Sequence, residues 1–288
     1  MANTNNHTRY IDQIAVLGEA GQRRLGRTRV HIAGLGGLGS NVALLLSQLG
    51  VGRISANDPQ VVEPSNLSRF ILGDAADLGK FKVEVAARHL ARWPALGFTP
   101  LVAPNESSAT ECMIALAGWV FSCANTVEAR VAAARMAVQT GTSIIDVGVA
   151  DGRELLAGTV KIWRPSFPSW AACPACTLPS RAPTKRREGW LFSVIALTAS
   201  ISVQLFVEHA CRGRRKPQLA NMLTLDAERF TIESAAINRS PYCRACADVS
   251  GGASIHKPAN TAALVAGVTT PAELSSSWLE ADCHVQGV

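Results

Sequence analysis

The chain has 288 residues, of which 48% are hydrophobic and 17% charged, so it can bury a large core and is too apolar to be wholly disordered. Its formal net charge is +6, but the densest basic clusters, at residues 185–187 and 212–216, are short and lack interleaved aromatic side chains, which disfavours nucleic-acid binding. We find no apolar run of the roughly 20 residues that span a bilayer and no secretory signal, so we expect a cytoplasmic protein without a membrane span.

The first half of the chain alternates between helical and extended patterns. Apolar residues recur at helical spacing in residues 9–25, 40–49, 82–92 and 127–140. Runs rich in β-branched and apolar residues predict strands at residues 29–33, 53–57, 99–102, 119–123 and 143–149. Strands that alternate with helices form a parallel sheet covered on both faces. We therefore expect an α/β fold with a Rossmann-like, mostly parallel sheet and helices on both faces.

The second half of the chain has a different character. Residues 158–163 and 222–232 alternate in the manner of antiparallel strands, and residues 191–211 form a long apolar helical pattern. Beyond these elements the composition turns to Gly, Ser, Ala, Thr and Pro. We therefore expect one domain over residues 1–248, with an antiparallel C-terminal extension of the sheet, and a flexible tail over residues 249–288.

A glycine-rich motif follows the first predicted strand and opens a helix. It runs Gly34-Leu-Gly-Gly-Leu-Gly39. Gly34 permits a tight turn, Gly36 and Gly37 let the backbone approach a phosphate, and Gly39 allows close packing of helix on strand. Asp58 ends the second strand about 20 residues further on, where it can hydrogen-bond ribose hydroxyls. The motif predicts a nucleotide site, and at this point an ordinary NAD-binding fold is a strong alternative.

Four of the eight cysteines form two Cys-x-x-Cys pairs. Cys173 pairs with Cys176, and Cys243 pairs with Cys246. In a cytosolic chain this arrangement favours metal over disulfides, and four thiolates in two knuckles suit a tetrahedral zinc ion. With no open coordination position, the predicted zinc has a structural role. Two redox-active pairs are the alternative.

Two segments after Asp58 do not resemble a dehydrogenase. Residues 62–69 read Val-Glu-Pro-Ser-Asn-Leu-Ser-Arg, and residues 79–84 read Gly-Lys-Phe-Lys-Val-Glu. Together with Arg-Tyr-Ile-Asp-Gln at residues 9–13 and the final cysteine pair, they resemble the ThiF/MoeB/HesA family, relatives of the ubiquitin-activating enzymes. The resemblance covers nearly the whole ordered chain. It implies a homodimeric, ATP-dependent adenylyltransferase that transfers AMP to a carboxylate, usually the C-terminal glycine of a small ubiquitin-like protein.

The resemblance also implies roles for individual residues. Asn66, Arg69 and Lys82 should line the triphosphate, with Arg69 and Lys82 on loops at the C-terminal edge of the sheet, stabilising charge on the phosphate oxygens. The family binds Mg²⁺ with an aspartate at the position of Asn125, and an amide lacks the charge that holds a hard cation. We therefore expect ATP, Mg²⁺ and structural Zn²⁺ as cofactors, with Asn125 a candidate catalytic residue.

Two further departures from the family pattern leave alternatives open. Asp12 replaces an arginine that in the family reaches the partner subunit's nucleotide. Residues 177–190, where many members carry a thioester- or persulfide-forming cysteine, contain none. The chain thus resembles members that adenylate without their own covalent sulfur link. The alternatives are a catalytically degenerate scaffold that binds nucleotide or a ubiquitin-like protein, and a relative that activates a base in tRNA.

Overall fold

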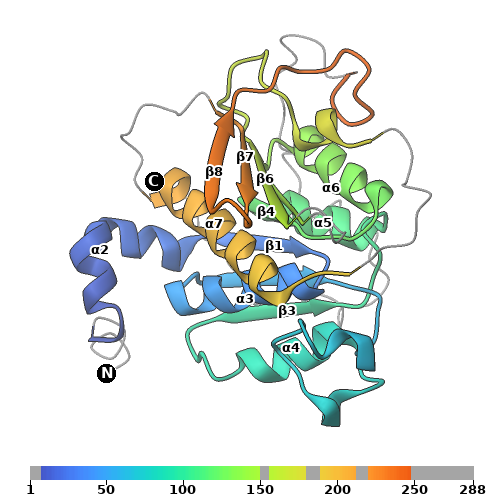
Figure 1. Ribbon diagram of the computed structural model, residues 1–288. Helices are drawn as coiled ribbons and strands as arrows, with labels where there is room; N and C mark the ends of the chain where they lie inside the picture. The colour runs from blue at the N-terminus through green and yellow to red at the C-terminus, as the bar shows by residue number, and fades with distance from the viewer. Residues whose placement is uncertain (1–7, 150–155, 180–188, 212–219, 248–288) are drawn as a thin grey trace.

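The computed structural model describes residues 8–149, 156–179, 189–211 and 220–247, which form an α/β fold around one eight-stranded sheet (Figure 1). The strands are β1 Arg29–Ala33, β2 Arg53–Asn57, β3 Gly97–Leu101, β4 Trp119–Ser122, β5 Ser143–Val149, β6 Ala157–Trp163, β7 Met222–Asp226 and β8 Thr231–Ala235. The helices are α2 Ile11–Arg27, α3 Gly37–Leu49, α4 Lys82–Leu90, α5 Ser108–Leu116, α6 Val127–Thr140 and α7 Phe192–Cys211, and three short 3-10 turns are η1 Pro64–Asn66, η2 Ala75–Asp77 and η3 Pro174–Thr177.

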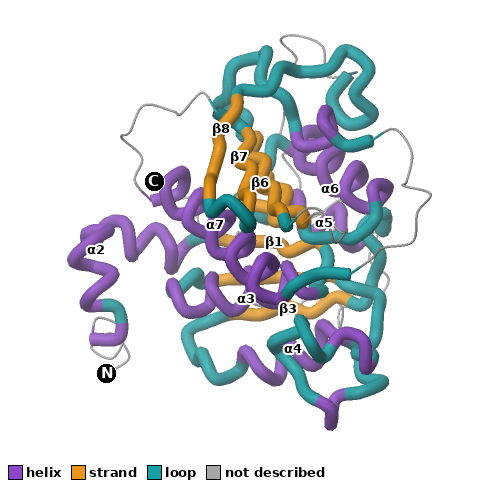
Figure 2. The backbone as a smooth tube through the Cα atoms, in the orientation of Figure 1, coloured by secondary structure: helices purple, strands orange, loops and turns teal. Residues whose placement is uncertain are grey.

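The strand order β3-β2-β1-β4-β5-β6-β7-β8 creates a crevice at the carboxyl ends of β1 and β4. The first five strands in this order are parallel, and the chain continues from β1 to β2 on one side and reaches β4 on the other. Ligands of open α/β sheets bind at such a switch point. Strands β6 to β8 add the predicted antiparallel extension, and Figure 2 shows them running across the direction of β1 and β3 as the sheet twists.

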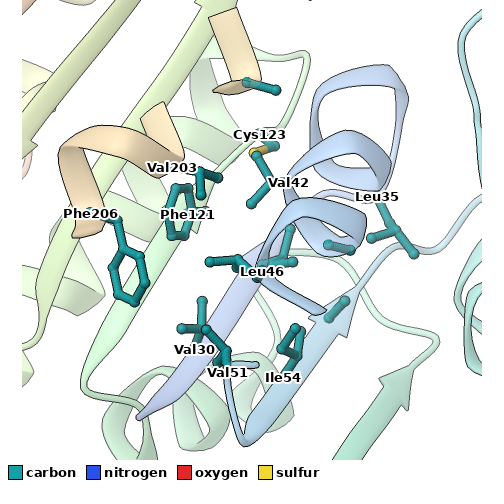
Figure 3. Close-up of a cluster of buried hydrophobic side chains, with 14 of the residues drawn as sticks. Val30, Leu35, Val42, Leu46, Val51, Ile54, Phe121, Cys123, Val203 and Phe206 are labelled. Atoms are coloured by element: carbon teal, nitrogen blue, oxygen red, sulfur yellow. The ribbon is translucent and has the colours of Figure 1, made fainter. Parts of the chain in front are cut away.

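Helices cover both faces of the sheet, and each face has its own apolar core. On one face, Val42 and Leu46 of α3 form one apolar cluster with Phe121 of β4 and the α7 side chains Val203 and Phe206 (Figure 3). The rings of Phe121 and Phe206 meet edge to face, 5.8 Å apart. On the other face, α6 packs against β4 and β5, and α5 packs against β1 and α6. Burial on both faces explains why β4 and β5 carry consecutive apolar residues, such as Val120 and Phe121 or Ile144 and Ile145.

Helix α7 belongs to this core, although by length and composition alone it could cross a membrane. Among the described residues it is the one helix that passes that test, whereas the sequence led us to expect no such segment. Half of its most apolar window is buried, and α7 packs against α3, β5 and β6. Its apolar length is therefore used here to cover the sheet.

The elements differ from the sequence-based expectations in three places. Helix α5 was missed, and the run at 222–232 is two strands, β7 and β8, joined by a turn in which Phe230 has a φ of 54°. Helix α2 has a kink at Gly18, whose φ is 70°. The predicted tail at 249–288 and both basic clusters lie outside the described residues.

Candidate active site

The turn between β1 and α3 requires glycine at two positions. Gly34 has a φ of +93°, and a Cβ there would lie 2.9 Å from the Cα of Ala124, just after β4. A Cβ on Gly39 would lie 2.1 Å from the carbonyl oxygen of Gly34, so α3 can pack this closely only without a side chain there. Gly36 and Gly37 line a cavity instead. Because α3 begins at Gly37, the free N–H groups of its first turn lie beside this cavity.

The carboxylate of Asp58 is buried and fixed at the end of β2. Its Oδ2 accepts a hydrogen bond from the backbone N–H of Leu35 at 2.8 Å, and its Oδ1 accepts one from the backbone N–H of Gln60 at 2.8 Å. Each carboxylate oxygen has a second lone pair, and Asp58 lines the same cavity as the glycine turn. The carboxylate can therefore accept a further hydrogen bond from a hydroxyl in the cavity.

Lys82 is the first residue of α4 and is only 4% exposed. Its Nζ donates a hydrogen bond to Oε1 of Gln60 at 2.7 Å. Burial lowers the pKa of Lys82, while the carboxylates of Asp58 and Glu63 oppose that shift. The expectation that Lys82 lies on a loop is wrong, because Lys82 begins α4, and its buried side chain lines the cavity from there.

Asn66 is the last residue of η1, and Arg69 lies in the turn that follows it. The Nη1 of Arg69 donates to the carbonyl oxygen of Ser65 at 2.5 Å, and the aliphatic stem of Arg69 lies against the backbone of Gly37. The Oδ1 of Asn66 accepts a hydrogen bond from the backbone N–H of Glu63 at 3.3 Å. Asn66 thus holds the shape of the turn that presents Arg69.

These side chains surround one cavity of about 660 Å³, a volume in the range of small-molecule sites. Of the residues that the sequence assigns to the nucleotide site and catalysis, those that line the cavity are Gly34, Gly36, Gly37, Asp58, Asn66, Arg69, Lys82 and Asn125. Gly39 does not line it, because its contacts are within the turn. Glu106 and Glu128 also line it, so the lining contains three acidic residues with Asp58.

A buried polar network that the sequence did not reveal lies behind the cavity. His31 of β1 shares hydrogen bonds with Oγ of Ser55 at 2.9 Å and Oδ1 of Asn57 at 3.0 Å. Asn57 donates to Oδ1 of Asn105 at 2.7 Å, and Asn105 donates to the carbonyl oxygen of Ala129 at 3.1 Å. Burial lowers the pKa of His31 to about 4, so the ring is neutral at pH 7. The network joins the middle of β1 and the end of β2 to α6.

A buried ion cluster lies beside the cavity. Arg130 of α6 donates through Nε to Oδ1 of Asp146 at 2.8 Å and makes a second, ion-paired contact through Nη2. Lys161 of β6 lies 3.9 Å from the same carboxylate, and Ser122 donates to it at 2.9 Å. These partners hold the pKa of Asp146 below its usual value despite its burial. Arg130 lines the cavity, and a Cβ on Gly148 would lie 2.9 Å from its Nη2.

The four predicted metal ligands come together away from this cavity. All four Sγ atoms of Cys173, Cys176, Cys243 and Cys246 lie within 4.8 Å of one another. The Cys173–Cys243 and Cys176–Cys246 separations are 3.6 Å, near the roughly 3.8 Å between thiolates of a tetrahedral zinc site. The backbone N–H of Ser240 donates to the Sγ of Cys176, and the backbone N–H of Ala245 donates to the Sγ of Cys243. The cluster can bind a metal ion, and the four cysteines form no disulfide.

The fold and the site define a class: a nucleotide-binding α/β protein with a switch-point cavity and a four-cysteine cluster. The pattern of the ThiF family matches residues 8–245. The chain belongs to the ThiF family. The structure is similar to E. coli MccB with ATP (TM-score 0.67, 19% identity, 83% of this chain and 74% of that one) and to PaaA (TM-score 0.66, 21% identity, 82% and 75%), which shows a shared fold.

Curated relatives agree with this assignment. The molybdopterin-synthase adenylyltransferase of Escherichia coli (strain K12) is 27% identical over 245 residues, which cover 83% of this chain and 95% of that protein. The adenylyltransferase and sulfurtransferase MOCS3 of Sus scrofa is 29% identical, over 83% of this chain and 53% of its own. The Aspergillus clavatus uba4 match, 43% identical, spans only 18% of that protein. By family, the chain is classed with the ATP-dependent adenylyltransferases.

Proposed function

We propose that this protein activates the C-terminal carboxylate of a small ubiquitin-like or sulfur-carrier-like protein, or of a peptide, by transferring AMP to it from ATP. The observation that carries the proposal is the convergence of an open glycine turn, the buried carboxylate of Asp58 and the cations of Arg69 and Lys82 on one cavity. Two curated relatives that match most of this chain are adenylyltransferases.

The reaction assigns a distinct task to each group. The acceptor carboxylate oxygen bonds to the α-phosphorus while the bond from that phosphorus to the bridging oxygen breaks and pyrophosphate leaves. Negative charge grows on the phosphate oxygens, and the fixed charges of Arg69 and Lys82 stabilise it. Asp58 holds the ribose hydroxyls, and the N–H groups at the start of α3 hold phosphate oxygens.

The residues around the cavity also suit Mg²⁺. This ion is typically held by one or two carboxylates together with substrate phosphates, and Asn125 with the carboxylates of Glu106 and Glu128 supplies oxygen ligands on the α6 side. Bound there, Mg²⁺ would neutralise phosphate charge. The four-cysteine cluster fits Zn²⁺, which has no open position in such a site and would tie η3 to the loop after β8.

The product of this chain's own chemistry is an acyl-adenylate. Residues 177–190 contain no cysteine, and the thiol of Cys123, which lines the cavity, has its pKa raised by burial. A thiolate nucleophile is therefore disfavoured there. The acyl-adenylate would pass to a separate sulfur or amine donor.

Isotope exchange between pyrophosphate and ATP tests the proposal. We expect exchange with a ubiquitin-like protein that ends in Gly-Gly and none when the same protein ends in a carboxamide, because the amide cannot attack phosphorus. ATP binding without exchange for any carboxylate acceptor would favour the scaffold alternative, and exchange that depends on RNA would favour tRNA activation.

A further inference from the structure

Trp190 stacks on the arginine of the proposed phosphate site. The Cζ of Arg69 lies 5.0 Å from the centre of the Trp190 ring. Trp190 stands two residues before α7, far in sequence from Arg69, yet both side chains line the same cavity. Trp190 is the one aromatic side chain among the described residues that line it.

Arg69 is restrained on three sides. Its stem lies against Gly37, where a Cβ would stand 3.2 Å from Cγ and Cδ of Arg69, so the glycine leaves room for the stem. Its Nη1 donates to the carbonyl oxygen of Ser65 at 2.5 Å. The ring of Trp190 covers the guanidinium from the side of α7. An arginine side chain without such contacts loses rotamer entropy when a ligand fixes it.

A guanidinium can contact an aromatic ring and a phosphate at the same time. A guanidinium is attracted to an aromatic ring through its flat face, whereas it binds phosphate oxygens through N–H groups that lie in its plane. The two interactions are therefore compatible, and Trp190 can orient the guanidinium without competing with a nucleotide.

We propose that Trp190 is a positioning residue that holds Arg69 ready for the phosphates of ATP. This inference rests on the proposed function. This role would make the segment that leads into α7 a part of the nucleotide site, because a movement of Trp190 would release the Arg69 side chain from its position. Trp190 itself makes no bond to the reacting atoms.

A double-mutant cycle tests the coupling. Binding of a non-hydrolysable ATP analogue is measured by calorimetry for the wild type, Trp190→Ala, Arg69→Ala and the double variant. We expect Trp190→Ala to weaken binding roughly 3- to 30-fold and to change it less than about twofold when Arg69 is already alanine. Equal effects in both backgrounds would overturn the inference.

Conservative variants separate stacking from simple packing. Trp190→Phe keeps an aromatic face and should restore most of the affinity, whereas Trp190→Leu keeps only apolar bulk and should not. Trp170→Ala, which removes a partly exposed tryptophan away from the cavity, is the matched control and should bind like the wild type. If Trp190→Leu binds as well as Trp190→Phe, Trp190 is only a packing residue and the inference is overturned.

Failure of this inference can be distinguished from failure of the proposed function. The cycle measures nucleotide binding without an acceptor, so coupling between Trp190 and Arg69 would stand even if no carboxylate acceptor supports pyrophosphate exchange. Conversely, if an acceptor supports exchange but Trp190 and Arg69 show no coupling, the positioning role of Trp190 is rejected and the proposed function stands.

Discussion

At the scale of single residues, Asn125 is a position where the family resemblance implies a carboxylate and the chain has an amide. It is exposed at the cavity, just before α6, and carries an amide in place of the expected carboxylate. We expect Asn125→Asp to strengthen Mg²⁺ dependence and raise the exchange rate, because a carboxylate adds the charge that a hard cation prefers. Exchange measured across a Mg²⁺ titration checks this. Rapid exchange in the wild type that slows in Asn125→Asp would mean that the amide is an adaptation.

Substitutions of Arg69 and of Lys82 should differ in their effect on folding. Arg69→Ala and Lys82→Ala should each lower the AMP-transfer rate about 10²- to 10³-fold, the effect of removing a preorganised donor. Arg69 is partly exposed, so its loss should leave unfolding nearly unchanged. Lys82 is buried and bonded to Gln60, so its loss should also cost about 1–3 kcal/mol of unfolding free energy. Rates and denaturant curves on the same samples distinguish the two; a normal rate in both variants would remove these residues from the proposed site.

The lowered pKa of Asp77 should make the free energy of unfolding depend on pH. Hydrogen bonds from Arg88 and Lys80 hold its pKa at about 2, below the ordinary 3.8. Because the folded pKa is depressed, the stabilisation is fully present above the ordinary value and is lost as pH falls through about 2. The difference in unfolding free energy between the wild type and Asp77→Asn should therefore be largest near neutral pH and shrink on acidification. Denaturant unfolding at several pH values measures it, and a constant difference would contradict this role.

At the scale of elements, sequence patterns located the strands and the site turn well. Strands β1, β2 and β5 lie where predicted, because each is a short run with β-branched residues bounded by a turn or a helical pattern. Helix α5 was missed because it is short and buried on most sides, so it shows no clear helical periodicity. Its one local signal is Ser107, whose side chain accepts a hydrogen bond from the backbone N–H of Thr110.

The residues of the site likewise divide into those that local sequence motifs predict and those that depend on contacts between distant segments. The glycine turn, Asp58, Arg69 and Lys82 belong to local motifs and could be predicted. The pairing of Arg130 with Asp146 depends on how α6 packs on β5, and the contact of Trp190 with Arg69 joins distant segments. No local pattern specifies such contacts.

The cysteine knuckles join two elements that are distant in sequence, so their metal should contribute to folding. We expect Cys243→Ser to lower the bound zinc and the stability together, because metal binding to a site that closes a long loop adds to the folding free energy. Elemental analysis and thermal unfolding of the same preparation test this, with a substitution at Cys112, which is outside the cluster, as control. Folded wild-type protein that carries no metal would contradict the prediction.

At the scale of the whole molecule, α2 offers a surface for a second copy. Figure 1 shows this helix extending away from the sheet, and its side chains Ile11 and Val16 are 56% and 67% exposed. We predict a homodimer in which residues near the start of α2 approach the neighbour's nucleotide site. Light scattering at tens of micromolar, with and without ATP, checks the mass; Val16→Asp should favour the monomer, and a wild-type monomer under both conditions would count against pairing.

The central proposal is that AMP is transferred from ATP to an acceptor carboxylate in this cavity. Pyrophosphate exchange with a purified ubiquitin-like acceptor tests it most directly. We predict exchange that requires a free C-terminal carboxylate and that falls about 10²- to 10³-fold in Arg69→Ala. Exchange that is unchanged in Arg69→Ala, or wild-type protein that binds ATP but exchanges nothing with any carboxylate acceptor, would contradict it.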